Sequence, residues 1–241
     1  LVAQLNGRLD SLDAIAVAAE AQLESEAGLP TREVERRSNE LIALRDATWS
    51  LRNDRLRTAK AVGDLAGKDA SASARNAYLA IQQAFSALDR MEVRGRDSAG
   101  VHVLVWGHGL DASNKQVAPL LAGRLDDALF TNGSVRVGAG DRAWSFVYKA
   151  AAEIGELGDN TRAMRAAVSA DALLRLLISQ PNTRVSILGH TRWASVGIIS
   201  EPNAHPVNSE EVGGNASAPY MLAALNGDVD NHADIKVRNA L

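Results

Sequence analysis

Residues 92–109 read EVRGRDSAGVHVLVWGHG, and the character of the chain changes within this stretch. Its second half, from Gly100 to Trp106, is short and rich in β-branched residues, which predicts a strand. Its first half joins that strand to a helical pattern and combines glycine with Arg94 and Asp97. Because loops at the ends of strands often carry functional side chains, this junction is a candidate part of a site.

The residues before this stretch have an almost continuous helical pattern. Apolar positions repeat at alternating steps of three and four, as on one stripe of a helix. The first stripe comprises Val2, Leu5, Leu9, Leu12, Ala16, Ala19 and Leu23. Gly28, Leu29 and Pro30 end it, and a second stripe runs from Val34 to Leu65. Two such helices joined by a short turn should pack as an antiparallel hairpin, so residues 1–70 are expected to form a helical insertion.

The remaining residues, 71–241, are expected to form the second domain. A helix around residues 77–88 precedes the first strand, and further strands are predicted at 184–188 and 220–225. Asn132-Gly133 predicts a hairpin between residues 128–130 and 135–137. From Trp144 to about Ser179 the pattern again predicts helix, with an interruption at residues 155–160. Strands that are grouped, with helices on either side, favour an α+β fold.

Composition excludes several classes of function. The chain has 241 residues, 46% of them hydrophobic, and a formal charge of −3, so we expect no general attraction to nucleic acid or to an anionic membrane. No apolar run approaches about 20 residues and the start lacks the pattern of a signal peptide, which predicts a soluble cytoplasmic protein. There is no cysteine, and the histidines lack the spacing of a zinc site, so we expect neither a disulfide nor a metal.

Two further segments combine glycine with polar residues, Gly189–Gly197 and Leu225–His232. The planar guanidinium of Arg192 could bind both oxygens of a carboxylate. Asn226 and Gly227 could offer a side-chain amide and a backbone N–H to one oxyanion. Residue chemistry alone leaves other interpretations open, because Arg192 could be a surface arginine and Asn226-Gly227 only a type I′ turn.

Three motifs in order resemble those of class II glutamine amidotransferases of the glucosamine-6-phosphate synthase type. Residues 88–100 are similar to that family's Glu-Tyr-Arg-Gly-Tyr-Asp-Ser-Ala-Gly stretch, and residues 190–194 to its His-Thr-Arg-Trp-Ala loop, which residues 200–206 continue. Residues 226–232 are similar to its Asn-Gly-x-x-x-Asn-His segment. The resemblance covers roughly residues 77–232 and implies an amino-terminal-nucleophile (Ntn) hydrolase fold, an αββα sandwich, here incomplete.

The resemblance also implies an activity and the residues that perform it. The family hydrolyses glutamine to glutamate and ammonia, which passes to a phosphosugar, here expected to be fructose 6-phosphate. No cofactor is implied; the expected partners are L-glutamine, downstream sugar-isomerase domains and a second subunit of a homodimer. Asn226 and Gly227 would form the oxyanion hole, and Arg192 would hold the glutamine carboxylate. Further implied site residues are Trp193, Ala194 and Ser195 in the substrate loop, with Arg94, Asp97 and His205 in support.

The chain also departs from the family pattern. In the family a cysteine attacks the amide and its own α-amino group acts as the base. These 241 residues contain no cysteine, so we expect the nucleophile to lie outside them and these residues to be inactive alone. Val196 and Leu225 stand where the family has histidine.

The sequence offers three alternatives. The segment Gly138–Ala143 fits a loose dinucleotide-binding pattern, but a predicted hairpin precedes it and the next strand comes too late. Ser98 does not fit a serine-hydrolase elbow, because Arg96 occupies its first glycine position. The remaining alternative is a catalytically silent amidotransferase-like domain with a role in assembly or regulation, in which residues 1–66 contact a partner.

Overall fold

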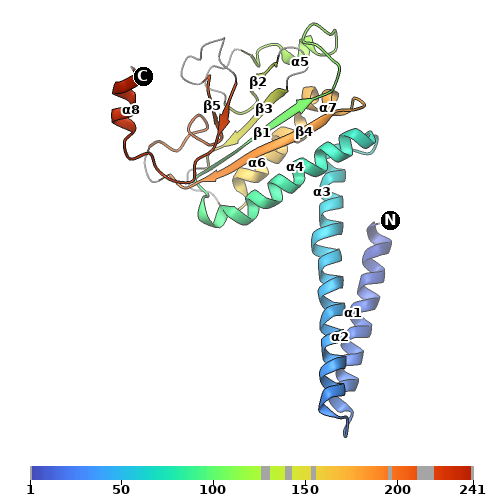
Figure 1. The fold of residues 1–241 in the computed structure, drawn as a ribbon. Coiled ribbons are helices and arrows are strands. Elements are labelled where there is room, and N and C mark those ends of the chain that lie inside the picture. Colours follow the sequence, from blue (N-terminus) through green and yellow to red (C-terminus); the bar gives the residue numbers. More distant parts are fainter. Residues whose placement is uncertain are drawn as a thin grey trace. The chain divides into compact units, whose positions relative to one another are not determined.

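The computed structural model describes residues 2–125, 131–138, 143–152, 156–194, 197–210 and 220–239 (Figure 1). The chain divides into two compact units, Leu1–Asp64 and Leu65–Leu241. Helices in the described part of the chain are all too short or too polar to cross a bilayer.

The first unit is an antiparallel pair of helices. α1 (Val2–Ser25) and α2 (Thr31–Ser50) are joined by a turn in which Gly28 adopts a φ of 89°. α2 continues through a π-helical turn, Leu51–Leu56, into α3 (Arg57–Ala66), whose last residues belong to the second unit. Polar pairs join the two long helices along their length. They are Arg37 with Glu26, Arg45 with Glu20, Thr48 with Asp13, and Arg52 with both Asp10 and Asp13.

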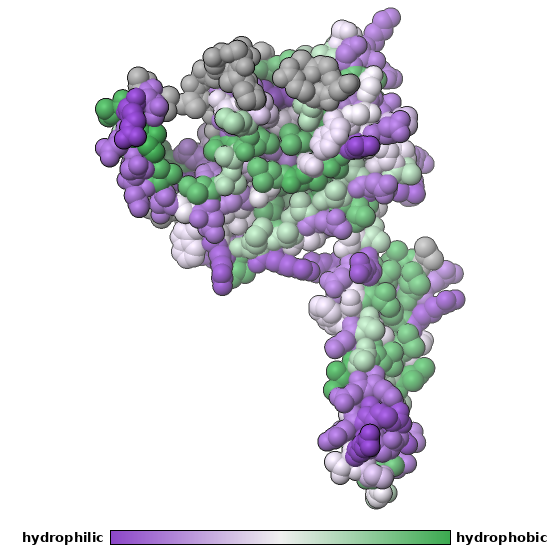
Figure 2. Space-filling view, viewed as in Figure 1, coloured by the Kyte–Doolittle hydropathy of each residue, from purple (hydrophilic) through white to green (hydrophobic). Residues whose placement is uncertain are grey.

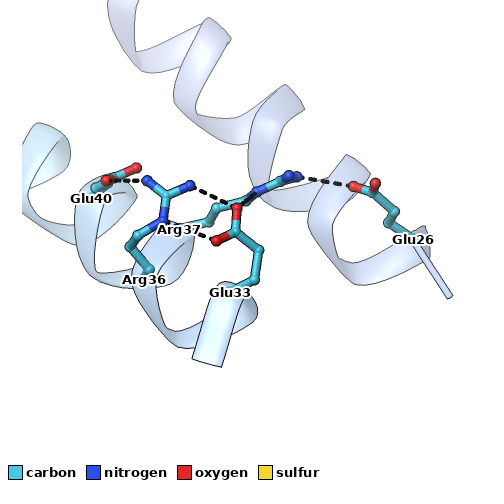
Figure 3. A network of polar contacts seen from close by, with 5 residues as sticks. All are labelled: Glu26, Glu33, Arg36, Arg37 and Glu40. Carbon is cyan, nitrogen blue, oxygen red and sulfur yellow. Dashed lines mark hydrogen bonds and ion pairs between the residues drawn. The ribbon is translucent and has the colours of Figure 1, made fainter. Parts of the chain in front are cut away.

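A network of ion pairs closes the tip of this hairpin (Figure 3). Glu33 accepts hydrogen bonds from Arg36 at 2.6 Å and from Arg37 at 2.8 Å, and Arg37 also reaches Glu26 at 3.1 Å. The hydrogen bonds from Arg36 and then Arg37 lower the pKa of Glu33 to about 2. Because these side chains face water, the network orients the tip more than it stabilises the hairpin.

The second unit is built on a four-stranded antiparallel sheet. Its strands follow the order β2 (Val135–Arg136), β3 (Trp144–Ala150), β1 (Ser98–Trp106) and β4 (Arg184–Arg192). In the central strand, Gly100 pairs with Lys149 on one side and with His190 on the other. This combination of helices with an antiparallel sheet confirms the predicted α+β class.

Helices cover one face of the sheet (Figure 1). They are α4 (Ala72–Met91), α6 (Asp159–Ala170) and α7 (Ala172–Ile178). Alternate residues of β1, from Ala99 to Val105, face them and are at most 1% exposed. The rest of this core comes from Tyr78, Ile81, Phe85, Leu88, Met164, Val168, Leu174, Leu177, Phe146 and Tyr148.

The opposite face of the sheet carries a smaller layer. Here β5 (Val207–Asn208) pairs with β6 (Leu222–Ala223), and His205, two residues before β5, lies against Gly100 of β1. A Cβ at Gly100 would lie 2.6 Å from the carbonyl oxygen of His205, so this contact needs glycine. The short elements are α5 (Ala118–Leu121), a 3-10 turn at Glu92–Arg94 and α8 (His232–Asn239).

Two predictions from the sequence were wrong or incomplete. The helix predicted to begin at Trp144 is instead β3, and helix starts only at Asp159. All seven residues of β3 are buried, including Ser145 and Lys149, which alternate with Trp144, Phe146 and Tyr148 in a pattern that fits a strand. Residues 128–130 of the predicted hairpin lie outside the described residues, and β2 pairs with β3. Residues 139–142 of the glycine-rich segment also lie outside them.

Asp171 connects three elements on the helical side of the sheet. Its carboxylate accepts hydrogen bonds from Arg124 at 2.9 and 2.6 Å, from the Tyr148 hydroxyl at 2.7 Å and from the N–H of Leu174 at 2.9 Å. Burial by itself would raise the pKa of Asp171, but the bonds from Arg124 and Leu174 outweigh it and hold that pKa below its usual range. The charged carboxylate therefore caps α7 and anchors it to β3.

We expect Asp171→Ala to lower the free energy of unfolding by about 3 kcal/mol, since it leaves the Arg124 guanidinium and the Tyr148 hydroxyl without their acceptor. Urea denaturation followed by circular dichroism would measure the change. Asp64→Ala is the control, because Asp64 forms an exposed pair with Lys60 and its loss should matter little. Equal effects of the two substitutions would contradict the anchoring role of Asp171.

His102 is buried on the other face of β1. Its Nδ1 lies 3.2 Å from the Ser145 hydroxyl and 3.5 Å from that of Tyr220. Burial, followed by the positive charge of Lys149, lowers the pKa of His102 to about 3. The imidazole is therefore neutral at pH 7. Protonating it in acid would place a positive charge on a buried side chain.

The lowered pKa of His102 predicts a loss of stability in acid. Between pH 6.5 and pH 3 the unfolded chain binds a proton at His102 and the folded chain does not, so unfolding becomes easier by up to about 1.4 kcal/mol per pH unit. His102→Gln should flatten this dependence, as measured by urea midpoints from pH 6.5 to 4.5. The exposed His232 provides the control His232→Gln, which should keep the slope of the parent chain. Identical slopes for the parent and His102→Gln would overturn the assignment.

Candidate functional site

A cavity of about 570 Å³ lies where the end of β4, the 3-10 turn and the segment after β6 meet. Four separate parts of the sequence contribute to its wall. The lining residues are Arg94, His190, Thr191, Arg192, Trp193, His205, Leu225, Asn226, Gly227, Asp228 and Val229.

β4 brings His190 and Arg192 to the same wall. They are two residues apart on one strand, so their side chains point to the same face of the sheet. Their partners on β1 are Gly100 and Ser98, which belong to the face opposite the helices. The Arg192 guanidinium donates a hydrogen bond to the carbonyl of Ile198 at 3.4 Å, which draws the following loop back toward the strand.

The 3-10 turn and the residues that follow it pack against the end of β4. At Gly95 a Cβ would lie 3.0 Å from the carbonyl oxygen of Thr191, so the absence of a side chain allows the turn to approach the strand. The N–H of Asp97 donates to the carbonyl of Arg192 at 3.2 Å, and the Asp97 carboxylate accepts from the N–H of Ala194 at 2.8 Å. Asp97 thus holds the backbone on both sides of Trp193.

Asn226 and Gly227 follow β6 and form the opposite wall. The N–H of Leu225, the residue before them, donates to Nδ1 of His205 at 3.4 Å. Gly227 has a φ of 150°, a conformation that residues with side chains rarely adopt. Both Asn226 and Gly227 are exposed, so their polar groups are accessible from the cavity.

Two histidines connect the walls. The rings of His190 and His205 are 5.0 Å apart. Burial lowers the pKa of both, and for His205 the nearby His190 and Arg192 lower it further. Nδ1 of His190 is buried without a hydrogen-bond partner in the described part of the chain. With both imidazoles neutral, the positive charge of this cavity comes from the guanidinium groups of Arg94 and Arg192.

The structure brings together most of the residues singled out in the sequence. Arg94, Arg192, Trp193, His205, Asn226 and Gly227 line the cavity, and Ala194 and Asp97 bond to each other beside it. Ser195 and Val196 lie outside the described residues.

Sequence reasoning assigned no role to His190, Thr191, Leu225, Asp228 or Val229. β4 runs four residues beyond the strand predicted at 184–188, so that prediction did not show that His190 and Arg192 share one face of the strand.

The arrangement suits a small ligand that carries a carboxylate. A guanidinium on one wall can bind a carboxylate through two hydrogen bonds. The amide of Asn226 on the other wall can donate a hydrogen bond to a different oxygen of the same ligand.

Part of the chain is similar to a known enzyme. Over 93 residues, or 39% of this chain, it is 31% identical to glutamine–fructose-6-phosphate aminotransferase (isomerizing) of Caulobacter vibrioides. The matched region spans 14% of the length of that relative. This partial match suggests a relation to that enzyme family. Neither a protein-family model nor a solved structure matches the chain.

We expect Asp97→Ala to loosen the backbone around Trp193, because the N–H of Ala194 loses a charged acceptor. Amide hydrogen exchange at Ala194 should accelerate about 10-fold or more, given about 1.5 to 3 kcal/mol for a bond to a charged group. Asp111→Ala is the matched control, since its carboxylate bonds instead to Ser113. Unchanged protection at Ala194 in the Asp97 variant would show that the bond does not hold this segment.

Proposed function

We propose that residues 71–241 are part of the glutaminase domain of a class II glutamine amidotransferase, with an incomplete Ntn-hydrolase αββα sandwich as its fold. The observation that carries the proposal is that Arg192 and the Asn226-Gly227 pair line one cavity. The order of the three motifs and the partial similarity to an aminotransferase support it. Under this proposal residues 1–70 are an insertion that the glutaminase does not need for chemistry.

Each wall of the cavity has a separate task in this proposal. Arg192 binds the α-carboxylate of L-glutamine, and the loop of Trp193, Ala194 and Ser195 closes over the ligand. The side-chain amide of Asn226 and the N–H of Gly227 stabilise the oxyanion that forms when the glutamine side-chain amide is attacked. Arg94, Asp97 and His205 support these groups.

The reaction follows from that assignment. The α-amino group of a cysteine takes the proton of its thiol as the sulfur adds to the amide carbon, and it passes a proton to the departing nitrogen as the oxyanion collapses and ammonia leaves. Water then cleaves the resulting thioester to glutamate and restores the thiol. The cysteine has to come from outside these residues, which contain none. Ammonia then passes to a phosphosugar, and fructose 6-phosphate is the acceptor that the name of the relative supports. Downstream isomerase domains and a homodimer complete the proposed enzyme, which needs no cofactor.

Arg192→Ala tests the proposed function in the complete protein. Glutamine-dependent kcat/KM should fall at least about 100-fold because the carboxylate loses a bidentate partner, while synthesis with free ammonia should continue. Arg162→Ala is the control, because its guanidinium is exposed and pairs only locally with Asp159. Asn226→Ala should lower kcat by about 100-fold with little change in glutamine binding.

The outcomes separate two functions. Unchanged glutamine kinetics in Arg192→Ala would refute the proposal that Arg192 binds the α-carboxylate of glutamine. If the complete parent protein binds glutamine but releases no ammonia, the alternative holds, namely a silent amidotransferase-like domain that serves assembly or regulation.

A further inference from the structure

The helical hairpin exposes apolar side chains that its own packing does not cover. Within α1 and α2 only Leu9, Ala16 and Thr48 are buried in the described structure. Residues 14–19 of α1 read AIAVAA, so this part of the helix is apolar all round, which is typical of a covered helix. The exposed large apolar residues of the hairpin are Val2, Leu12, Ile15, Val17, Ile42, Trp49 and Leu51. In Figure 2 apolar surface gathers along the hairpin away from its charged tip.

Val17 and Trp49 line one groove of about 500 Å³ between the two helices. Val17 is 58% exposed and Trp49 is 63% exposed. Ile42 lies seven residues before Trp49 and therefore on the same side of α2. We call these three residues the Val17–Trp49 face.

Two charged residues at the rim of this face, Arg45 and Arg52, are paired within the hairpin, and Asp46 also lines the groove. Arg45 contacts Glu20 at 2.7 Å, and Arg52 contacts Asp13 at 2.9 Å. Both guanidinium groups therefore have carboxylate partners within the same hairpin, and covering the face would leave neither of them buried without a partner.

The two arms of the hairpin carry opposite net charge. In α1, Val2–Ser25, four carboxylates oppose one arginine, which leaves −3. Over residues 31–64, eight Lys and Arg residues oppose six Asp and Glu residues, which leaves +2. In a four-helix bundle of two hairpins, with the arms alternating around the bundle, each helix then has neighbours of opposite net charge.

We propose that the Val17–Trp49 face binds the same face of a second copy of this chain, forming a four-helix bundle from two hairpins. A 24-residue helix is about 36 Å long and about 10 Å wide, so two helices side by side offer about 700 Å² per copy. This approaches the roughly 800 Å² per partner of a stable, specific interface. A two-fold axis places the same patch on both copies, so the Trp49 ring of each can occupy the groove of the other. The inference names an interface for the homodimer of the proposed function and uses residues outside the proposed glutaminase domain.

Sedimentation equilibrium of the whole chain tests this interface. The parent chain should sediment as a dimer of 25.6 kDa subunits. Val17→Glu and Trp49→Lys should each raise the dimer dissociation constant at least about 10-fold, because each places an unpaired charge in an apolar contact. Val237→Glu is the matched control, since Val237 is 84% exposed on α8 and lies outside the hairpin. Circular dichroism would verify that the variants stay helical.

Cross-linking gives a second, independent readout because the chain has no cysteine. Val17→Cys and Trp49→Cys, alone or mixed, should form covalent dimers on mild oxidation at least about 10-fold faster than Val237→Cys. A chain that stays monomeric at about 100 µM would overturn the proposal. So would a dimer that neither Val17→Glu nor Trp49→Lys weakens, or one that cross-links no faster through the face than through Val237.

Discussion

The approach of the His205 carbonyl oxygen to Gly100 is the contact on which the candidate site depends. A Cβ at residue 100 would lie 2.6 Å from that oxygen, so any larger residue would push the chain around His205 away from the sheet. That segment carries the imidazole of His205, which lies 5.0 Å from the ring of His190 and accepts a hydrogen bond from the N–H of Leu225. One missing side chain in the central strand therefore allows the two walls of the cavity to meet.

The helical face of the sheet makes that placement rigid. Asp171 joins α7 to β3 through the Tyr148 hydroxyl and to the loop that carries Arg124, and α4 buries its apolar stripe on the same face. The cavity lies at the opposite face, where loops extend from the ends of the strands. Substitutions in these loops can change the site without disturbing the core. Since burial keeps both cavity histidines neutral, its positive charge comes from guanidinium groups, as recognition of a carboxylate requires.

Elements with a distinct local signature were predictable from the sequence, and β3 was not predicted. The apolar stripe of α4 follows from periodicity, and β1 follows from its β-branched composition although most of its residues are buried on both faces. In β3, Ser145 and Lys149 pack against the second layer and are as buried as Phe146 and Tyr148 on the first. Burial of such polar residues is decided by tertiary packing, so the local pattern does not reveal it.

The sequence by itself determined which residues were candidates for the site: a guanidinium at Arg192, an amide at Asn226 and glycines where the backbone needs them, since these are properties of single residues and short motifs. Only the tertiary structure decided that these groups line one cavity and that His190 and His205 join its walls. The physical reason is that 33 residues separate Arg192 from Asn226 along the chain. Their proximity depends on strand register and on layer packing, which no local pattern encodes.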